Sequence, residues 1–283
     1  MVTRLPITSK GSIQNPTADG DADYSCLGMR MAPTSTATDL VTFELKIEDF
    51  EDDFTTEGLR VQVFANNIVD LDSCDAPECS EGTTNSNGVV QVMGRPGAWF
   101  AYRVFEMIPP GSPREVDIVR GSVQYNNITP AAGGMTDGVS ISQKSLNLIP
   151  TVLGFNRKEG TAMLAGAIED CAGDNVYGTR ARVLVDGAVV PEGMNQFDPH
   201  YRYFNGDSFP SATQTFSHVD GLYSVANLEY PAGTNITMEI EGRRVDSGDG
   251  SPDADPVVLS RERVAIFPDT ITIVNPTPLR AGE

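Results

Sequence analysis

The chain has 283 residues, 40% of them hydrophobic, and a formal net charge of -19 at pH 7. This length supports one large or two ordinary domains that each bury a core, and the negative charge disfavours nucleic acids and anionic membrane surfaces as partners. The 27 glycines and 19 prolines indicate short strands joined by many turns rather than long helices.

Residues 1–37 are predicted to form an extended N-terminal segment. Its start, MVTRLPITSKGSIQ, lacks the apolar core of a secretory signal, and no run of about 18 apolar residues predicts a transmembrane helix. This pattern fits a cytoplasmic protein, or an extracytoplasmic one whose signal or lipoprotein segment is absent from this chain. The cysteines discussed below favour the second interpretation.

Residues 38–140 are predicted to form a first β-sandwich. Asn87-Gly88 and Pro96-Gly97 are turn dipeptides, because glycine and asparagine tolerate the positive φ of tight turns. The apolar alternation beside these turns places every second side chain in a core. The strand patterns are VTFELKI at 41–47, LRVQVFA at 59–65, VVQV at 89–92, AWFAYRVFE at 98–106 and REVDIVRGSV at 114–123.

Residues 141–160 are predicted to connect two sandwiches. The sequence SQKSLNL favours a short helix with Ser142 as its N-cap, and Pro150 is expected to end it. The apolar tail LIPTVLGF that follows is expected to lie between the sandwiches, which predicts a rigid contact rather than a free linker.

Residues 161–283 are predicted to form a second sandwich that repeats the first. IEDCAGD at 168–174 resembles IEDFEDD at 47–53, and Asp220-Gly221 takes the place of Asn87-Gly88. Because three separate segments recur in the same order, we interpret the chain as a tandem repeat. The strand patterns are AMLAGAI at 162–168, RARVLVDGAVV at 180–190, LYSV at 222–225, TNITMEIEG at 234–242 and VVLSRERVAIFPDTITIV at 257–274.

The four cysteines are Cys26, Cys74, Cys79 and Cys171. They allow three pairings, between which the sequence does not choose. Pairing Cys74 with Cys79 within DSCDAPECSEG would leave Cys26 with Cys171 and tie the N-terminal segment to the second half. Zinc is the competing use of C-x4-C, but further Cys or His at ligand spacings are lacking. We expect disulfides, and therefore an oxidising, extracytoplasmic location.

The order of apolar strand, small acidic turn, V-x-V strand, [DN]-G turn and Pro/Ala-Gly turn resembles the carboxypeptidase regulatory-like, or transthyretin-like, domain. With YSCLG at 24–28 and EDCAGD at 169–174, the chain resembles tandem-domain proteins among predicted surface lipoproteins of myxobacteria and their relatives. The resemblance covers roughly residues 24–276. It implies an all-β fold of two tandem antiparallel Ig-like or transthyretin-like β-sandwiches, and it implies little about function because such modules serve many proteins.

Calcium is the favoured small ligand, although a solvated acidic loop is the default interpretation of its predicted site. The segment VDSGDGSPDADP places Asp246, Asp249, Asp253 and Asp255 on a glycine-rich loop whose carboxylates suit a hard cation. It lacks the ligand register of an EF-hand. No other cofactor is expected.

Aromatic residues suggest a carbohydrate platform as a second binding site. The cluster Tyr201, Tyr203, Phe204 and Phe209 is expected to lie in a long loop of the second sandwich, where loops often carry function. On the first sandwich, alternation turns Phe100 and Tyr102 to one face and Trp99 to the other.

Iron is the remaining alternative, because intradiol dioxygenases share a related sandwich and bind iron through two Tyr and two His. His200, Tyr201, Tyr203 and His218 supply those residue types. The two histidines are 18 residues apart, whereas that family places them two apart on one strand face, so the spacing argues against the site.

These observations predict a non-enzymatic, extracytoplasmic structural or protein-interaction module of a bacterial cell envelope or surface assembly. Its expected partners are other envelope proteins or further copies of itself, through strand addition at sheet edges. The alternatives are a carbohydrate-binding or calcium-dependent adhesion module, and an iron enzyme.

Overall fold

The structure, a computed structural model, describes residues 5–11, 21–33, 35–50, 55, 57–75, 77–105, 121–243 and 255–283. Apart from one helix, the regular elements in these residues are strands, which confirms the all-β prediction. No helix in this part of the chain is long and apolar enough to cross a membrane.

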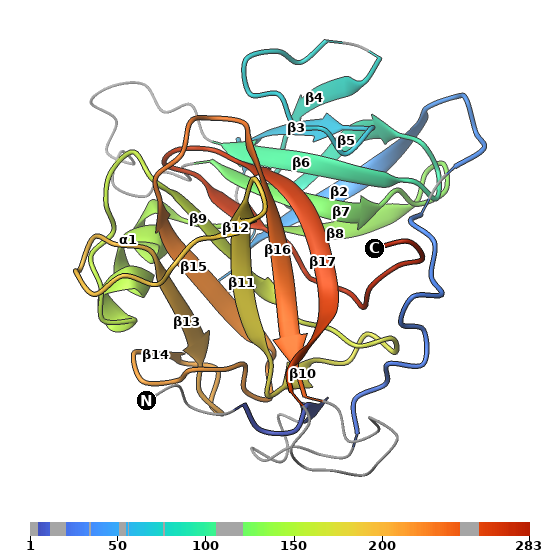
Figure 1. The fold of residues 1–283 in the computed structure, drawn as a ribbon. Helices are drawn as coiled ribbons and strands as arrows, with labels where there is room; N and C mark the ends of the chain where they lie inside the picture. The colour runs from blue at the N-terminus through green and yellow to red at the C-terminus, as the bar shows by residue number, and fades with distance from the viewer. Residues whose placement is uncertain are drawn as a thin grey trace.

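The first half of the molecule contains β2 to β8, and short β1 precedes it (Figure 1). Their bounds are β1 Ser9–Lys10, β2 Val41–Asp49, β3 Arg60–Phe64, β4 Cys79–Thr83, β5 Val89–Gly94, β6 Trp99–Phe105, β7 Ser122–Ile128 and β8 Met135–Ser140. The predicted strand at 114–123 lies outside the described residues up to position 120.

The second half contains β9 to β18, and helix α1 connects the two halves. The bounds are α1 Gln143–Val152, β9 Ala162–Ala167, β10 Val176–Tyr177, β11 Arg180–Val185, β12 Ala188–Val189, β13 His200–Phe204, β14 Pro210–Ser211, β15 Leu222–Leu228, β16 Thr234–Gly242, β17 Val257–Ile266 and β18 Ile271–Ile273.

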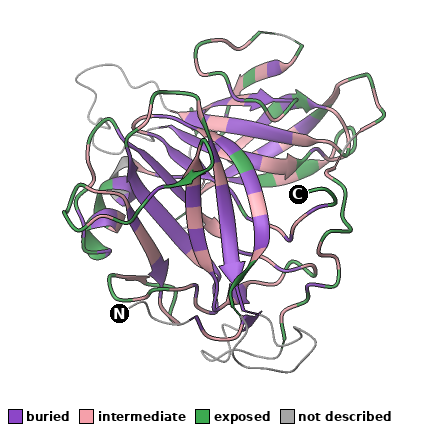
Figure 2. Ribbon diagram, in the orientation of Figure 1, coloured by how far each residue is buried: buried purple, intermediate pink, exposed green. Residues whose placement is uncertain are grey.

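The first half is a sandwich of a small sheet, β5-β2-β8, on the strands β4-β3-β6-β7. Alternate residues of β2, β3, β5 and β6 point between the two layers, as the apolar periodicity predicts. The buried core consists of Phe43, Leu45, Ile47, Leu59, Val61, Val63, Val90, Val92, Phe100, Tyr102 and Val104. Figure 2 shows buried residues interspersed with intermediate and exposed ones along these strands.

The second half uses the same pairings. β9 lies between antiparallel β15 and parallel β18, just as β2 lies between antiparallel β5 and parallel β8. β11 pairs with β16, as β3 pairs with β6. The turn glycines Gly88 and Gly221 have φ of 72° and 64°, so both [DN]-G dipeptides form the predicted turns.

Strand β18 joins the two halves. It lies between β9 and β7 and runs parallel to both, so that Thr272 is opposite Leu164 on one side and Val123 on the other. The result is one nine-stranded sheet, in the order β14-β13-β15-β9-β18-β7-β6-β3-β4, with strands from both halves (Figure 1). These parallel pairings were not expected from the sequence, because turn patterns reveal only strands that are neighbours along the chain.

The two faces of this long sheet are covered by different elements. On one face, Leu164 and Val123 share a core with Met238 and Val264 of the sheet β12-β11-β16-β17. On the other face, Ile271 and Met163 pack with Leu146 and Leu153 of the α1 region. The small sheet β5-β2-β8 covers the first-half strands on that second face. Val61 and Phe100 point toward this small sheet, whereas Phe64 and Ala101 point to the opposite face and belong to the other core.

Helix α1 is capped as predicted but is longer than expected. The Ser142 side chain accepts a hydrogen bond from the Ser145 backbone N–H at 3.1 Å. The helix continues past Pro150 to Val152, so the expected end was wrong. Pro150 has no N–H to donate, but the residues after it continue the helix, since the Leu153 N–H donates to the Ile149 carbonyl at 2.9 Å.

Both cysteine pairs form disulfides, Cys26–Cys171 and Cys74–Cys79. The first is reinforced by Asp170, whose buried carboxylate accepts the Asp23 N–H at 2.8 Å, and by the Cys171 N–H, which donates to the Asp23 carbonyl. This pairing therefore attaches the N-terminal segment to the acidic turn of the second half.

The two disulfides should differ in their effect on stability. In the chain-entropy description, a loop closed over 145 residues contributes about 5 kcal/mol and one closed over 5 residues about 2 kcal/mol. Urea unfolding of the paired variants Cys26→Ser/Cys171→Ser and Cys74→Ser/Cys79→Ser should show the larger loss for the first. Equal losses would contradict this account.

Shortening a side chain on β18 should destabilise both halves together. Ile271 is 3% exposed, and Ile271→Ala should lower the free energy of unfolding by about 2 to 4 kcal/mol. Scanning calorimetry should show one transition that moves to lower temperature as a whole. The control Val257→Ala, at a position 47% exposed, should change little. A split into two transitions, one of them unshifted, would show that the halves unfold independently.

Candidate binding site at the junction of the two halves

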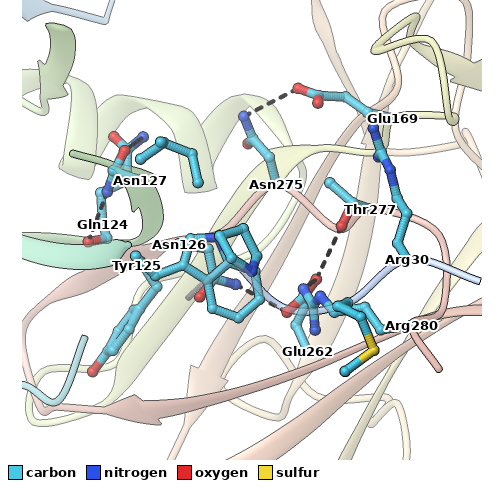
Figure 3. A pocket seen from close by; sticks show the side chains of 14 residues that line it. Arg30, Gln124, Tyr125, Asn126, Asn127, Glu169, Glu262, Asn275, Thr277 and Arg280 are labelled. Atoms are coloured by element: carbon cyan, nitrogen blue, oxygen red, sulfur yellow. Dashed lines mark hydrogen bonds and ion pairs between the residues drawn. The ribbon is translucent and has the colours of Figure 1, made fainter. Parts of the chain in front are cut away.

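A pocket of about 450 Å³ lies where the two halves and the N-terminal segment meet (Figure 3). The first half contributes the start of β6 and the end of β7, and the second half contributes β17 and the C-terminal residues. The lining residues are Arg30, Met31, Pro33, Trp99, Gln124, Tyr125, Asn126, Asn127, Ile128, Glu169, Glu262, Asn275, Thr277 and Arg280.

A buried ion pair lies at the base of this pocket. Glu262 and Arg280 have side chains only 3% and 9% exposed, and Arg280 Nη2 lies 2.6 Å from Glu262 Oε1. Asn126 of the first half donates from Nδ2 to Glu262 Oε2 at 2.9 Å. Burial raises the pKa of the Glu262 carboxyl above its usual range, although Arg280 acts in the opposite direction. The carboxylate is thus shared between the two halves.

Arg280 also contacts Trp99, an aromatic residue of the first half that lines the pocket. Its guanidinium lies 4.2 Å from the centre of the Trp99 ring, a cation–π contact. Beside it, the Ala281 N–H donates to the Arg30 carbonyl at 2.8 Å and the Gly28 N–H to the Leu279 carbonyl at 2.7 Å. Residues 28–30 of the N-terminal segment therefore lie beside residues 279–281 along this wall of the pocket.

Amide side chains of the pocket form hydrogen bonds with neighbouring side chains. Gln124 accepts from the Tyr102 hydroxyl and donates to Asn127 at 2.9 Å. Asn275 donates to Glu169 at 3.3 Å, and burial raises the pKa of the Glu169 carboxyl. The first two contacts lie within the first half and the third within the second half, so each half fixes its own amide side chains in the wall of the pocket.

The predicted calcium loop lies mostly outside the described residues. Asp246, Asp249 and Asp253 are not described, and Asp255 is exposed. Within the described ranges, no group of three His, Cys, Asp or Glu side chains is arranged to hold a metal ion.

The predicted aromatic platform is wrong in its placement. Residues 200–204 form strand β13 rather than a loop, since they pair antiparallel with β15 from His200 opposite Ala226 to Tyr203 opposite Tyr223. Tyr203 and Phe204 are 2% and 7% exposed, Tyr201 is half-buried, and Phe209 is 66% exposed. The four side chains do not present one exposed surface. Trp99, by contrast, does turn away from Phe100 and Tyr102 as predicted.

The four residues considered for iron binding are engaged in separate packing contacts. The His200 ring stacks on Phe155 with centroids 5.1 Å apart, whereas the His218 ring meets Tyr177 edge-on at 5.3 Å. The Tyr201 hydroxyl donates to the Val190 carbonyl at 2.7 Å, and burial raises the pKa of Tyr201 to about 12.

Tyr203 also makes a hydrogen bond within the fold. Its hydroxyl accepts from the Ala181 N–H at 2.9 Å, and burial raises the pKa of this phenol as well. The Tyr201 and Tyr203 hydroxyls therefore take part in separate hydrogen bonds to backbone groups of the fold.

Sequence reasoning missed Glu262 and Arg280. The sequence did contain a signal for Glu262, because it alternates with Val264 and Ile266 on the face of β17 that points into the core. A charged residue in such a register predicts a buried partner. The partner itself, 18 residues further on, carries no local signal.

Comparisons with known proteins give only distant likenesses. No family model matches the sequence, and no curated protein matches it. A streptococcal ancillary pilin is 15% identical, with a TM-score of 0.23, over 86% of this chain and 63% of that protein. The shaft pilin SpaA of Lactobacillus rhamnosus GG is 11% identical, with a TM-score of 0.23, over 85% of this chain and 98% of the pilin.

An intradiol ring-cleavage dioxygenase from Tetranychus urticae is 13% identical, with a TM-score of 0.17, over 36% of this chain and 59% of that protein. At these identities and TM-scores, none of the likenesses carries an argument about this chain. The all-β assignment rests on the strands and pairings described above.

Removing Arg280 should leave a buried, unpaired carboxylate. Arg280→Ala should lower the free energy of unfolding by about 3 to 5 kcal/mol at neutral pH. Because the pKa of Glu262 is raised in the folded state, the deficit should be smallest below the ordinary carboxyl pKa of about 4.5 and should grow as pH rises through the folded-state value. Urea unfolding at several pH values measures this.

Two controls separate the ion pair from other effects of the substitution. The double variant Glu262→Gln/Arg280→Ala should recover much of the loss, since no charge is then left buried. Arg30→Ala removes an exposed arginine of the same pocket and should change stability little. A loss of unfolding free energy that is the same at every pH and is unchanged by Glu262→Gln would contradict the proposed role of the ion pair.

Proposed function

We propose that this protein is a non-enzymatic structural or protein-interaction module of a bacterial cell envelope or surface assembly. The observation that carries the proposal is the nine-stranded sheet, in which β18 of the second half pairs with β7 of the first. Two modules connected in this way form one rigid body rather than two domains on a linker, and a rigid spacer or scaffold is what such a construction suits.

An extracytoplasmic location is supported by the cysteines. All four form disulfides, and one of these closes a loop of 145 residues. Disulfides persist where the environment is oxidising, as outside the cytoplasm. The resemblance to surface lipoproteins extends this proposal to a chain anchored through a lipidated segment.

The absence of catalysis is part of the proposal. The side chains best suited to acid–base or metal chemistry, His200, His218, Tyr201 and Tyr203, pack on rings or bond to backbone groups. Burial raises the pKa of both Tyr201 and Tyr203, so both phenols are neutral hydrogen-bonding groups in this fold. Their positions support a role in packing.

Sheet edges are the proposed contact surfaces for partners. The outer strands of the larger sheets are β4, β5, β8, β12, β14 and β17. An outer strand has backbone groups available to a further strand, so other envelope proteins or a second copy are suitable partners. The excess negative charge keeps copies dispersed until a specific contact forms.

Labelling of intact cells tests this proposal. Cells that produce the protein are treated with a membrane-impermeant amine-reactive biotin and then with an alkylating reagent, without reductant, before mass analysis. We expect biotin on the protein before lysis and no alkylated cysteine, because all four are paired. Labelling only after lysis, together with alkylated thiols, would contradict the location and with it the function.

A further inference from the structure

A second, apolar pocket lies on the face of the nine-stranded sheet that α1 covers. Its volume is about 220 Å³, and residues of both halves line it. Phe50 and Ile149 come from the first half and the connecting helix, whereas Phe204 and Ile273 come from the second half. This pocket differs from the polar junction pocket, although Gln124 and Asn275 line both.

Small side chains on two neighbouring strands create the hollow. Ala165 and Ala167 of β9 lie opposite Ser224 and Leu222 of β15. Large residues such as Met163, Ile271 and Phe204 stand around them. Since close-packed interiors leave few voids larger than a water molecule, a hollow of this size requires small residues on its floor.

One polar group of the pocket lacks a partner. Ser224 is 4% exposed, and its hydroxyl has no hydrogen-bond partner among the described residues. A buried hydroxyl without a partner is unfavourable, so a ligand hydroxyl that hydrogen-bonds to Ser224 would gain binding free energy.

The remaining polar side chains of the lining are occupied. The Tyr223 hydroxyl donates to the Val274 carbonyl at 2.7 Å, and Asn275 accepts the Ala167 N–H at 3.1 Å. Gln124 is held by Tyr102 and Asn127. Among the residues that the structure describes, no Asp, Glu, Lys, Arg or His lines the pocket. The lining therefore selects a neutral ligand with one hydrogen-bonding group.

We infer that this pocket binds a small neutral phenol: one aromatic ring with a single hydroxyl that hydrogen-bonds to Ser224. A dry apolar cavity of about 150 Å³ holds a benzene ring. The somewhat larger volume here suits a ring with one or two small substituents. Phe50 and Phe204 provide aromatic walls, against which a ring packs favourably. The site goes beyond the structural role proposed above and does not depend on it.

Calorimetric titration with two matched probes tests the inference. p-Cresol has the ring, a methyl group and the hydroxyl, whereas toluene lacks only the hydroxyl. We expect the wild-type protein to bind p-cresol at least about fivefold more tightly than toluene, which corresponds to one hydrogen bond. Ser224→Ala should lose this preference and bind p-cresol no more tightly than toluene, because the p-cresol hydroxyl then has no partner.

Two further variants control the result. Ser122→Ala removes another buried, unpaired hydroxyl, on β7, that does not line the pocket, and it should keep the preference for p-cresol. Ala165→Leu, checked for folding by circular dichroism, should fill the hollow and abolish binding of both probes. A wild-type protein that binds neither probe, or binds toluene as tightly as p-cresol, would overturn the inference. A preference that survives in Ser224→Ala would also overturn it.

Discussion

The parallel pairing of β18 with both β9 and β7 is the interaction on which the rest of the structure depends. A sandwich with a strand at the edge of its sheet exposes a row of backbone donors and acceptors. Here β18, which pairs with β9 and ends the sheet of the second half, also pairs with β7 at the end of the first-half sheet, so the strands form one sheet. The covering layers, the junction pocket and the apolar pocket all take their positions from that sheet.

Polar contacts, together with the strand pairing, fix how the two halves are placed relative to each other. Glu262 of the second half is buried and receives hydrogen bonds from Asn126 of the first half and from Arg280 near the C-terminus. A buried charge of this kind is costly unless its partners are in place, so it favours one relative placement of the two halves over others. The Cys26–Cys171 disulfide adds the N-terminal segment to the same arrangement.

Local signals in the sequence were sufficient for most of the strands. Gly88 and Gly221 adopt the positive φ that the turn dipeptides require, and Ser142 caps the helix. Each of these features depends on residues a few positions apart. The same reasoning placed Tyr201 and Tyr203 in a long loop ahead of the Asp220-Gly221 hairpin, whereas both lie on β13.

The site could be predicted far less well, because it depends on residues distant in sequence. Neither the insertion of β18 beside β7 nor the pairing of Glu262 with Arg280 follows from periodicity. Likewise, Ala165 and Ser224 are ordinary small residues until the β9–β15 register places them opposite each other. Their joint effect, a hollow with one unpaired hydroxyl, belongs to the folded sheet.

Native-state hydrogen exchange measured by mass spectrometry, over increasing denaturant, tests the central claim most directly. If the two halves form one cooperative unit through β18, amides of β6 and β7 and amides of β9 and β15 should share one opening free energy and one denaturant dependence. If peptides of one half open at clearly lower denaturant while those of the other stay protected, the shared sheet does not unite the molecule and the account is wrong.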